Sequence, residues 1–554
     1  MLSEIETRDE LAYLLNVKHS VLTYVLYIAK PSSYYYTFHI PKKNGGFREI
    51  NASQGILKTI QKKLIYQIES CQEYCFRLED RHTNIAHAFT KGKGIITNAR
   101  IHKNKRIIVN IDLKDFFHAI HFGRVKGYFE KNRYFQLPSE IATIIAQLTC
   151  YKGHLPQGAP SSPIITNLIC QSFDYHVLKI AKKYRLDYTR YADDLTFSTN
   201  WSQFPEEFTA FFAELKKEIS RNGFTVNEAK TRLVNRESKQ TVTGLTVNKK
   251  INADRSFYKS TRAMLDSLYK NRAFSIDDQP GTLCRLEGRF SFIDDITHYN
   301  NKNDGNKHDI YRLSGREKDY QKFLFYKYFI ANEKPVIATE GKTDVLYIKS
   351  ALKNMHERYP SLITKKQDGT FSFSVSFLRR SVKKQYFFNM SPDGADSLKN
   401  IYQFFTGKQS GFSNYYKMLS NPDMDNAVIL LFDNEQSANY PLKKFLDSAN
   451  LNASQITNLR EKHYTRIVGN SKLFLVTTPL VQGKDKTEME DLFTQTTLNT
   501  VIDGKHFTTD NKYDSSMFYG KDRFSKYVYA NYATIDFSGF IPLLDAIVKA
   551  IKTK

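Results

Sequence analysis

Residues 185–200 read RLDYTRYADDLTFSTN and carry two adjacent acids, Asp193 and Asp194, near their centre. Runs rich in β-forming residues flank the pair on both sides, which predicts the tip of a tight hairpin. Carboxylates between apolar strands are costly unless a cation neutralises them. Surface turns with Asp-Asp are nonetheless common, so the pair by itself does not establish catalysis.

A second β-rich run, residues 106–118, contains Asp112. Acids from separate strands that meet at one point are how a two-metal site for phosphoryl transfer is assembled. We therefore predict that Asp112, Asp193 and Asp194 are catalytic and hold two Mg²⁺ ions. The (Y/F)xDD turn and the acid on the neighbouring strand together resemble the palm of reverse transcriptases.

The composition limits the class of partner. The chain has 554 residues, enough for more than one domain, and a formal net charge of +24 with a pI near 9.4. This excess of Lys and Arg favours nucleic acid or an anionic membrane. No apolar run approaches the roughly 20 residues that span a bilayer, and the N-terminus lacks the charge pattern of a signal peptide. We therefore expect a cytoplasmic protein that binds nucleic acid and no membrane.

Residues 34–50, YYYTFHIPKKNGGFREI, are typical of a hairpin because Asn-Gly tolerates the positive φ that tight turns need. Reverse transcriptases have a basic fingers hairpin of the form IPKKxGxxRxI over the template and the incoming nucleotide. The resemblance implies that Arg48 contacts a triphosphate or the template. It also implies that Phe117, five residues after Asp112, clashes with a 2′-OH and so selects deoxynucleotides. The alternatives are a merely basic turn and a core phenylalanine.

Two further stretches resemble polymerase elements. Residues 155–163, LPQGAPSSP, match the LPQGxxxSP element of reverse transcriptases and precede an expected helix from about residue 164 to 184. This match implies that Gln157 and Gly158 contact substrate. Residues 223–231, GFTVNEAKT, resemble the palm element whose lysine, here Lys230, lies close to the leaving phosphate.

Two motifs resemble retron reverse transcriptases in particular. Residues 98–102, NARIH, match NAxxH, and residues 242–248, VTGLTVN, resemble both a primer-grip hairpin and the retron VTG motif. A lone histidine would more often lie in the core or on the surface. The resemblance implies RNA contacts by Asn98, His102, Val242, Thr243 and Gly244.

The first part of the chain is therefore expected to be an α+β right-hand polymerase. Fingers and palm, with an N-terminal helical cap, would occupy residues 1–250. The basic, helical pattern of residues 251–330 is typical of a thumb, and residues 286–293, LEGRFSFI, match a thumb helix of retron enzymes.

The composition changes at about residue 333, where short apolar runs begin to end in acids. Glu340 follows the first run and Asp433 the second. Because α/β domains place active-site groups at the carboxyl ends of strands, we predict that these acids converge on a divalent metal. The three runs are residues 336–339, 427–432 and 473–477.

EGKTD at 340–344, DNE at 433–435 and EDLF at 490–493 together resemble a Toprim domain of overcoming-lysogenization-type nucleases. Glu435 departs from the second aspartate of the family's DxD pair, although a longer carboxylate still binds metal. The resemblance implies an α/β Toprim domain with a parallel sheet over residues 331–495 and a C-terminal extension over 496–554. Taken singly, each acid is more readily a solvated loop carboxylate. The implied Mg²⁺ or Mn²⁺ ligands are Glu340, which is also catalytic, Asp433, Glu435, Glu490 and Asp491.

A reverse transcriptase joined to a Toprim domain matches one subtype of retron enzyme. The resemblance implies that the polymerase uses dNTPs to copy a cognate structured non-coding RNA, primed from an internal 2′-OH, into a branched RNA–DNA hybrid (msDNA). It also implies a Toprim nuclease effector that the ribonucleoprotein restrains, a role in bacterial antiphage defence, and scope for a homo-oligomer.

Other functions stay open. A mobile-element reverse transcriptase, such as a group II intron enzyme, would carry a maturase or HNH-type region after the thumb, and neither is evident. An RNA-packaging protein with an inactive polymerase is disfavoured by the intact acids and Lys230. A topoisomerase-like or primase-like Toprim protein would need a strand-passage tyrosine domain or a zinc module.

Overall fold

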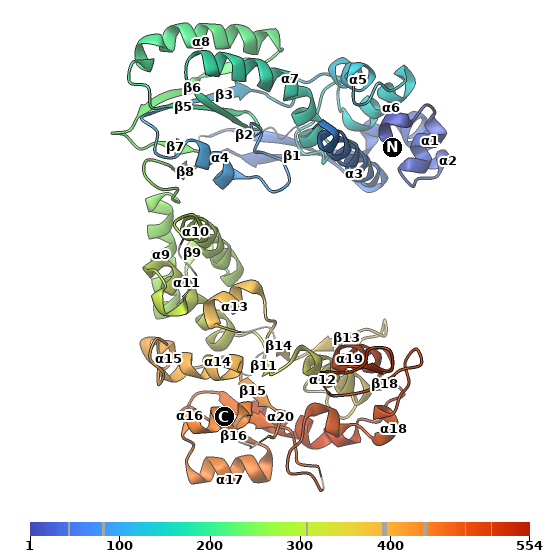
Figure 1. The fold of residues 1–554 in the computed structure, drawn as a ribbon, viewed down its shortest axis with the longest axis vertical. Coiled ribbons are helices and arrows are strands. Elements are labelled where there is room, and N and C mark those ends of the chain that lie inside the picture. The colour runs from blue at the N-terminus through green and yellow to red at the C-terminus, as the bar shows by residue number, and fades with distance from the viewer. Residues whose placement is uncertain are drawn as a thin grey trace. The chain divides into compact units, whose positions relative to one another are not determined.

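The computed structural model describes residues 1–553 except 43–44, 80–83, 306–308, 391–395, 436–439, 482 and 511. The chain forms two compact units, Met1–Tyr258 and Lys259–Lys554 (Figure 1).

The first unit begins with short helices and an antiparallel hairpin. Strand β1 (Tyr35–Pro41) pairs with β2 (Phe47–Ser53), and Phe38 lies opposite Ile50. The predicted hairpin is therefore confirmed, although residues 43–44 of its turn lie outside the described residues. The helices of this part are η1 (Leu2–Glu4), α1 (Arg8–Leu14), α2 (His19–Thr23), η2 (Tyr24–Ile28), η3 (Pro31–Tyr34), α3 (Gly55–Glu79) and α4 (Ile95–Ile101).

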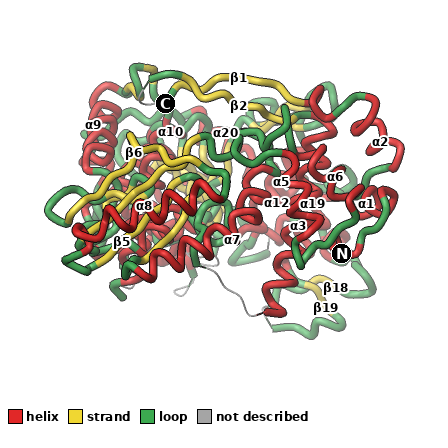
Figure 2. Tube along the Cα trace, turned by 90° about the horizontal axis from the view of Figure 1, so that it is seen from above, coloured by secondary structure: helices red, strands yellow, loops and turns green. Residues whose placement is uncertain are grey.

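A four-stranded antiparallel sheet forms the centre of the first unit. Its strand order is β4 (Asp187–Tyr191), β5 (Asp194–Thr199), β3 (Ile107–Lys114) and β6 (Thr225–Asn235). The hairpin predicted around Asp193 is thus confirmed as β4–β5. Helices α7 (Ser162–Lys183) and α8 (Phe204–Arg221) lie side by side against the sheet (Figures 1 and 2). Phe197 of β5 and Phe211 of α8 are buried in contact with one another, with ring centroids 5.1 Å apart. The hairpin therefore packs on a hydrophobic core.

The remaining elements of the first unit flank this sheet. They are α5 (Phe122–Lys131), α6 (Ser139–Thr149) and a small hairpin of β7 (Thr241–Val242) and β8 (Leu245–Thr246). No single described helix is both long and apolar enough to span a bilayer, and one sharply bent pair, Arg8–Leu14 with His19–Ile28, passes that test by length and composition alone.

Residues 251–330, expected as a separate thumb, are mostly helical, and from Lys259 onward they belong to the same compact unit as the segment that follows. Phe325 packs against Phe405, with ring centroids 4.8 Å apart. Because buried aromatic side chains from both sides meet there, the boundary expected after residue 330 does not separate two compact units. The elements here are α9 (Arg255–Asn271), β9 (Ser275–Ile276), β10 (Gln279–Pro280), α10 (Leu283–Asn303), η4 (Ile310–Arg312), α11 (Gly315–Phe325) and η5 (Tyr326–Ile330).

A five-stranded sheet forms the centre of the second unit. Its order is β14 (Ser376–Phe377), β11 (Val336–Thr339), β15 (Val428–Phe432), β17 (Leu473–Thr477) and β16 (Tyr464–Arg466). All neighbouring strands are parallel except β16, which runs antiparallel to β17. The three predicted apolar strands are therefore confirmed as β11, β15 and β17.

Both faces of this sheet are covered. Leu430 enters the core shared with α10 and α11, whereas Ile429 and Leu431 enter a second core. Burial on both faces explains why the strands are almost continuously apolar. The second core is formed with α12 (Lys342–Asn354), α19 (Lys521–Ala530) and α20 (Ile541–Lys552).

The other elements of the second unit surround this sheet or belong to the C-terminal extension. They are β12 (Ile363–Lys365), β13 (Phe371–Phe373), α13 (Val382–Phe388), α14 (Asp396–Thr406), α15 (Tyr415–Met418), α16 (Pro441–Ala449), α17 (Ala453–Lys462), η6 (Met489–Leu492), α18 (Gln495–Leu498), β18 (His506–Phe507), β19 (Phe518–Tyr519) and η7 (Ser538–Phe540).

Candidate active site

The three acids predicted to be catalytic lie together at one end of the antiparallel sheet. Asp112 on β3 is directly opposite Asp194 on β5. Asp193 lies in the turn between β4 and β5, where Ala192 has a φ of 56° and the Asp193 carbonyl accepts a hydrogen bond of 3.0 Å from the Leu113 N–H. The hairpin and β3 thus hold the three carboxylates side by side.

The negative charges of the three neighbouring carboxylates make ionisation of Asp193 and Asp194 less favourable at this end of the sheet. Desolvation, followed by the charges of Asp193 and Asp112, raises the pKa of Asp194 to about 7. Desolvation also raises the pKa of Asp193, and Asp112 adds to that rise. A cation among these oxygens would relieve the repulsion.

A lysine supplies part of that charge. Lys230 Nζ on β6 lies 3.0 Å and 3.1 Å from the two carboxylate oxygens of Asp112, and Asn227 Nδ2 donates to the same carboxylate at 2.8 Å. The sequence predicted Lys230 near a leaving phosphate, and it did not single out Asn227. The spacing gave no signal, because residues three apart on a regular strand point to opposite faces. The register shift between β3 and β6 at Asn110 and Asp112 brings both side chains to Asp112.

The residues predicted to bind substrate differ in how exposed their side chains are. Arg48 is exposed on β2 and close enough for its charge to lower the pKa of Asp193. Phe117 is half-buried beside the buried Phe116, with ring centroids 5.7 Å apart. Phe117 therefore keeps one part of its ring available to a ligand, whereas Phe116 belongs to the core.

Gly158 has a clear backbone role. Its φ is +123°, and a Cβ there would lie 2.7 Å from Ile50 Cγ2 and 3.0 Å from the Asn51 carbonyl oxygen. The Asn51 N–H donates to the Gln157 carbonyl at 2.8 Å. The LPQG segment thus packs closely on β2 of the fingers hairpin, which only glycine permits at this position.

Most of the residues predicted to contact RNA are enclosed. Asn98, His102 and Val242 are at most 1% exposed, so their side chains offer no surface to RNA in this structure. His102 instead bridges Ser198 and Thr189, at 2.7 Å to each hydroxyl, and links α4 to the sheet. Burial lowers the pKa of His102 to about 3 and keeps it neutral. Of the predicted set, Thr243 is half-buried and Gly244 is exposed.

A buried ion pair beneath the hairpin was not predicted. Arg190 on β4 donates two hydrogen bonds of 2.8 Å to Asp174 on α7. Its guanidinium also lies 3.4 Å from the Ala192 carbonyl, one residue before Asp193. The pair therefore ties the hairpin turn to α7, and the signal in the sequence was an arginine within a strand rich in β-forming residues.

A second cluster of acids lies at the carboxyl ends of the parallel strands. Glu340 follows β11, Asp433 follows β15, and Glu340 Oε1 accepts a hydrogen bond of 3.0 Å from the Asp433 N–H. Desolvation, followed by the charges of Asp344 and Glu435, raises the pKa of Glu340 to about 8. The pKa of Asp433 is raised as well, by desolvation and then by Asp344, Glu340 and Glu490. The cluster of interacting charges around Glu340 therefore includes Asp344, Asp433, Glu435 and Glu490.

Asp344 is a member of this cluster that the sequence analysis quoted within EGKTD but did not assign. It is buried, and its carboxylate accepts a hydrogen bond of 2.8 Å from the Gly341 N–H at the start of α12. Its position four residues after Glu340, in the first turn of the helix, was the available signal.

Two of the predicted ligands differ in their surroundings. Glu435 is buried and lies 3.4 Å from Lys486. The Asp491 carboxylate accepts a hydrogen bond of 2.8 Å from the Glu488 N–H and pairs with Lys484, so it caps η6. A role for Asp491 as a metal ligand stays a prediction.

A lysine from the C-terminal extension completes the second cluster. Lys521 Nζ lies 2.7 Å from Glu488 Oε2 and 3.0 Å from Glu490 Oε2. Glu490 Oε1 accepts a hydrogen bond of 3.2 Å from the Tyr347 hydroxyl. The Lys521 charge also lowers the pKa of Asp344 and Asp433, against the larger effect of burial.

Both centres offer carboxylate oxygens, which are the ligands that a hard divalent cation prefers. Within the described part of the chain, however, no group of three or more His, Cys, Asp or Glu side chains is already arranged to hold a metal ion. In each centre a lysine instead contacts one or two of the acids. The residues fit a metal by type and charge, and binding would require their carboxylates to reorient.

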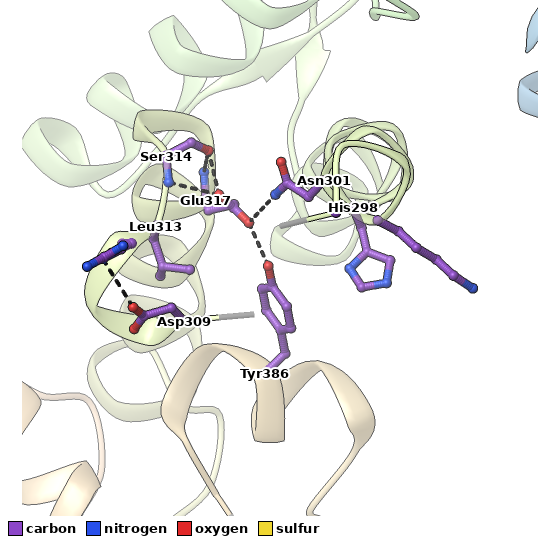
Figure 3. A pocket seen from close by; sticks show the side chains of 10 residues that line it. His298, Asn301, Asp309, Leu313, Ser314, Glu317 and Tyr386 are labelled. Carbon is purple, nitrogen blue, oxygen red and sulfur yellow. Dashed lines mark hydrogen bonds and ion pairs between the residues drawn. The ribbon is translucent and has the colours of Figure 1, made fainter. Parts of the chain in front are cut away.

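A cavity of about 900 Å³ lies elsewhere in the second unit and contains none of the predicted site residues (Figure 3). Its wall includes Glu317, whose carboxylate accepts hydrogen bonds from Ser314, Asn301 and Tyr386. These contacts satisfy the carboxylate and join α10, α11 and α13.

Comparison with known proteins identifies relatives of the first part of the chain. Residues 40–247 match the family model described as reverse transcriptase (RNA-dependent DNA polymerase). The chain is 30% identical to the retron Mx162 reverse transcriptase of Myxococcus xanthus, over 45% of this chain and 54% of that protein. It is 32% identical to the retron Mx65 reverse transcriptase of the same organism, over 52% of this chain and 67% of that protein.

A third relative is the retron Ec86 reverse transcriptase of Escherichia coli, at 36% identity over 35% of this chain and 59% of that protein. The chain thus spans about half the length of the first of these relatives and two thirds of the second. A solved telomerase structure from Candida tropicalis also matches, at 16% identity and a TM-score of 0.30 over 43% of this chain and 61% of that one, which is too low to support any argument. On the similarity to the Mx65 enzyme, the chain belongs to the retron reverse transcriptase family.

Proposed function

We propose that this chain is an RNA-directed DNA polymerase that copies a cognate structured non-coding RNA into branched msDNA, primed from an internal 2′-OH. The observation that carries the proposal is the position of Asp112 opposite Asp194, with Asp193 in the adjoining turn. Family membership supports it, because the relatives are named as retron reverse transcriptases.

Two Mg²⁺ ions bound by these acids would lower the pKa of the attacking hydroxyl and neutralise charge on the leaving pyrophosphate. The other residues would position the substrates. Lys230 contacts Asp112 and would be released toward phosphate when ions bind. Arg48, exposed on the fingers hairpin, would bind the triphosphate or the template. The half-buried ring of Phe117 would exclude a 2′-OH.

Sequencing the nucleic acid that copurifies with the protein tests this proposal. Parallel samples treated with RNase or DNase should reveal one RNA species joined to a complementary DNA through a 2′–5′ branch. Bound RNA without complementary DNA would instead support an RNA-packaging protein, and linear DNA copied from an intron would support a mobile-element enzyme.

We propose a second function for the acids of the parallel sheet. Glu340, Asp433, Glu435 and Glu490, with the newly assigned Asp344, would form a Toprim centre that binds Mg²⁺ or Mn²⁺. The supporting observation is that Glu340 and Asp433 follow neighbouring parallel strands and share a hydrogen bond. Acids at such a sheet edge, given a metal ion, would activate water against a phosphodiester.

This Toprim centre would be the effector of an antiphage system, restrained by the ribonucleoprotein. Its test is Mn²⁺-dependent cleavage of DNA and RNA by the protein after its own nucleic acid has been removed, with Glu340→Ala as the control. Cleavage that persists in Glu340→Ala would place the activity elsewhere. Assembly into a homo-oligomer is part of the same proposal, and light scattering of the ribonucleoprotein tests it.

A further inference from the structure

Lys521 lies in the second acidic cluster although it is distant in sequence from every predicted metal ligand, including Glu490 and Asp491. Its ammonium bridges Glu488 and Glu490, at 2.7 Å and 3.0 Å. Glu490 is 4% exposed at its side chain, whereas Glu488 is 28% exposed. The lysine therefore contacts one enclosed acid and one that solvent reaches.

The lysine is delivered by a well-anchored helix. Lys521 is the first residue of α19, whose Phe524 stacks on Phe507 with ring centroids 4.3 Å apart and also packs against Tyr347 of α12. Lys342 and Asp522 add an ion pair of 3.0 Å between α12 and α19. Packing thus holds the backbone of Lys521 beside the acids, and the contacts with Glu488 and Glu490 hold its ammonium.

The two oxygens of Glu490 are both engaged. Tyr347 donates to Oε1 and Lys521 to Oε2. A divalent ion bound through Glu490 Oε2 would lie within a few ångströms of the ammonium, where two positive charges repel strongly in a partly enclosed site. The ammonium and the ion therefore exclude one another at this oxygen.

We propose that Lys521 is a positioning residue of this centre, whose ammonium holds Glu488 and Glu490 and competes with a divalent ion for their oxygens. Ion binding then releases the Lys521 ammonium from the acids, while the packing of Phe524 keeps α19 in place. The C-terminal extension thereby sets the metal affinity of the centre. This inference rests on the proposed metal-binding role of the acids.

Mn²⁺ binding to the full chain tests the proposal, measured by calorimetry after removal of bound nucleic acid. The background carries Asp112→Asn, Asp193→Asn and Asp194→Asn, so that the polymerase acids do not contribute. Lys521→Met should bind Mn²⁺ at least about tenfold more tightly, because one positive charge has left the site. The matched control Lys526→Met lies on the same helix with its side chain 69% exposed and should change affinity less than about twofold.

Two further measurements keep the test decisive. Lys521→Arg retains the charge and should restore the weaker affinity. In the unsubstituted protein, amine labelling read by mass spectrometry should show that saturating Mn²⁺ increases modification of Lys521 at least about threefold relative to Lys526.

Unchanged or weaker affinity in Lys521→Met, or unchanged labelling of Lys521 with Mn²⁺ bound, overturns the competition while leaving the metal centre intact. Absence of Mn²⁺ binding in every variant overturns the metal centre and this inference together. The two failures are therefore distinguishable.

Discussion

The two acidic centres of the chain are each balanced by a lysine, but the lysines come from different places. In the first centre, Lys230 stands on β6, next to the strand of Asp112, and its side chain is 56% exposed. In the second, Lys521 comes from the C-terminal extension, is 36% exposed, and contacts the enclosed Glu490. The lysine of the first centre is thus the more exposed of the two and comes from the strand beside Asp112, whereas the lysine of the second comes from a remote segment of the same chain.

The largest expected effect comes from substituting acids of the first centre, which tests whether this centre carries the polymerase activity. Asp193→Asn combined with Asp194→Asn should reduce cDNA synthesis by on the order of a thousandfold or more, because the ligands for both metal ions are lost. Folding and RNA binding should change little, since the substituted side chains support no core. Primer extension and RNA retention on the purified protein measure the two effects. Normal cDNA from the double variant would refute the assignment of the first centre.

The reverse experiment substitutes an acid of the second centre and tests whether cDNA synthesis continues without it. Glu340→Ala should abolish nuclease activity and phage defence, while cDNA accumulates at the level of the unsubstituted protein. The expectation follows because Glu340 and the palm acids belong to separate compact units. Plaque assays and msDNA yield from the same cells give the comparison. Full defence would make the second centre a scaffold, and complete loss of cDNA would mean that the two centres act as one.

A smaller effect concerns the sugar-selecting role proposed for Phe117 in the first centre. Phe117→Ala should raise the use of ribonucleotides relative to deoxynucleotides by about tenfold, with a modest loss of dNTP incorporation, because a half-buried ring no longer blocks a 2′-OH. Competition between rNTPs and dNTPs in primer extension measures the ratio. Phe116→Leu is a matched control, because its ring is buried and it should leave the ratio unchanged. An unaltered ratio in active Phe117→Ala would place Phe117 in the core.

The fold was most predictable where local patterns dominate. The hairpin around Asp193 and the strands before Glu340 and Asp433 follow from β-forming runs bounded by turns or acids. The same local signals located the acids of the two sheet ends. Motif likeness was less informative about Asn98 and His102, because a motif does not reveal whether its side chains are buried.

Long-range packing was not predictable in the same way. The expected thumb shares a core with the following segment because Phe325 and Phe405 are buried together, which no local pattern encodes. Lys521 was missed for the same reason: nothing near it in sequence indicates that α19 returns to the acids at Glu490. The capping contact of Asp491 with the Glu488 N–H was likewise not predicted from its place beside Glu490.

The smallest effect is a pH dependence in metal-free protein, and it compares the two centres directly. The pKa of Asp194 is raised to about 7 in the folded state, from an ordinary value of 3.8. Between these values the folded protein binds more protons than the unfolded chain, so stability is greatest below the ordinary value and falls as the pH rises to about 7. Because Asp194 is exposed and screened by solvent, we expect a loss of only about 1 kcal/mol. Denaturation in EDTA from pH 4 to 9 measures it.

Variants of Asp194 and Glu340 show how much of the pH dependence of stability comes from each centre. Asp194→Asn should reduce the fall that ends near pH 7 in the unfolding of the first unit, because an amide has no proton to lose and only the raised pKa of Asp193 then contributes. Glu340→Gln should reduce a fall that continues to about pH 8 in the second unit, where the pKa of Glu340 is raised to about 8 and that of Asp433 is also raised. Saturating Mg²⁺ should flatten both slopes, since an ion replaces the protons as the source of positive charge. A slope that is unchanged in both variants would show that other groups, and not these acids, determine the pH dependence of the metal-free protein.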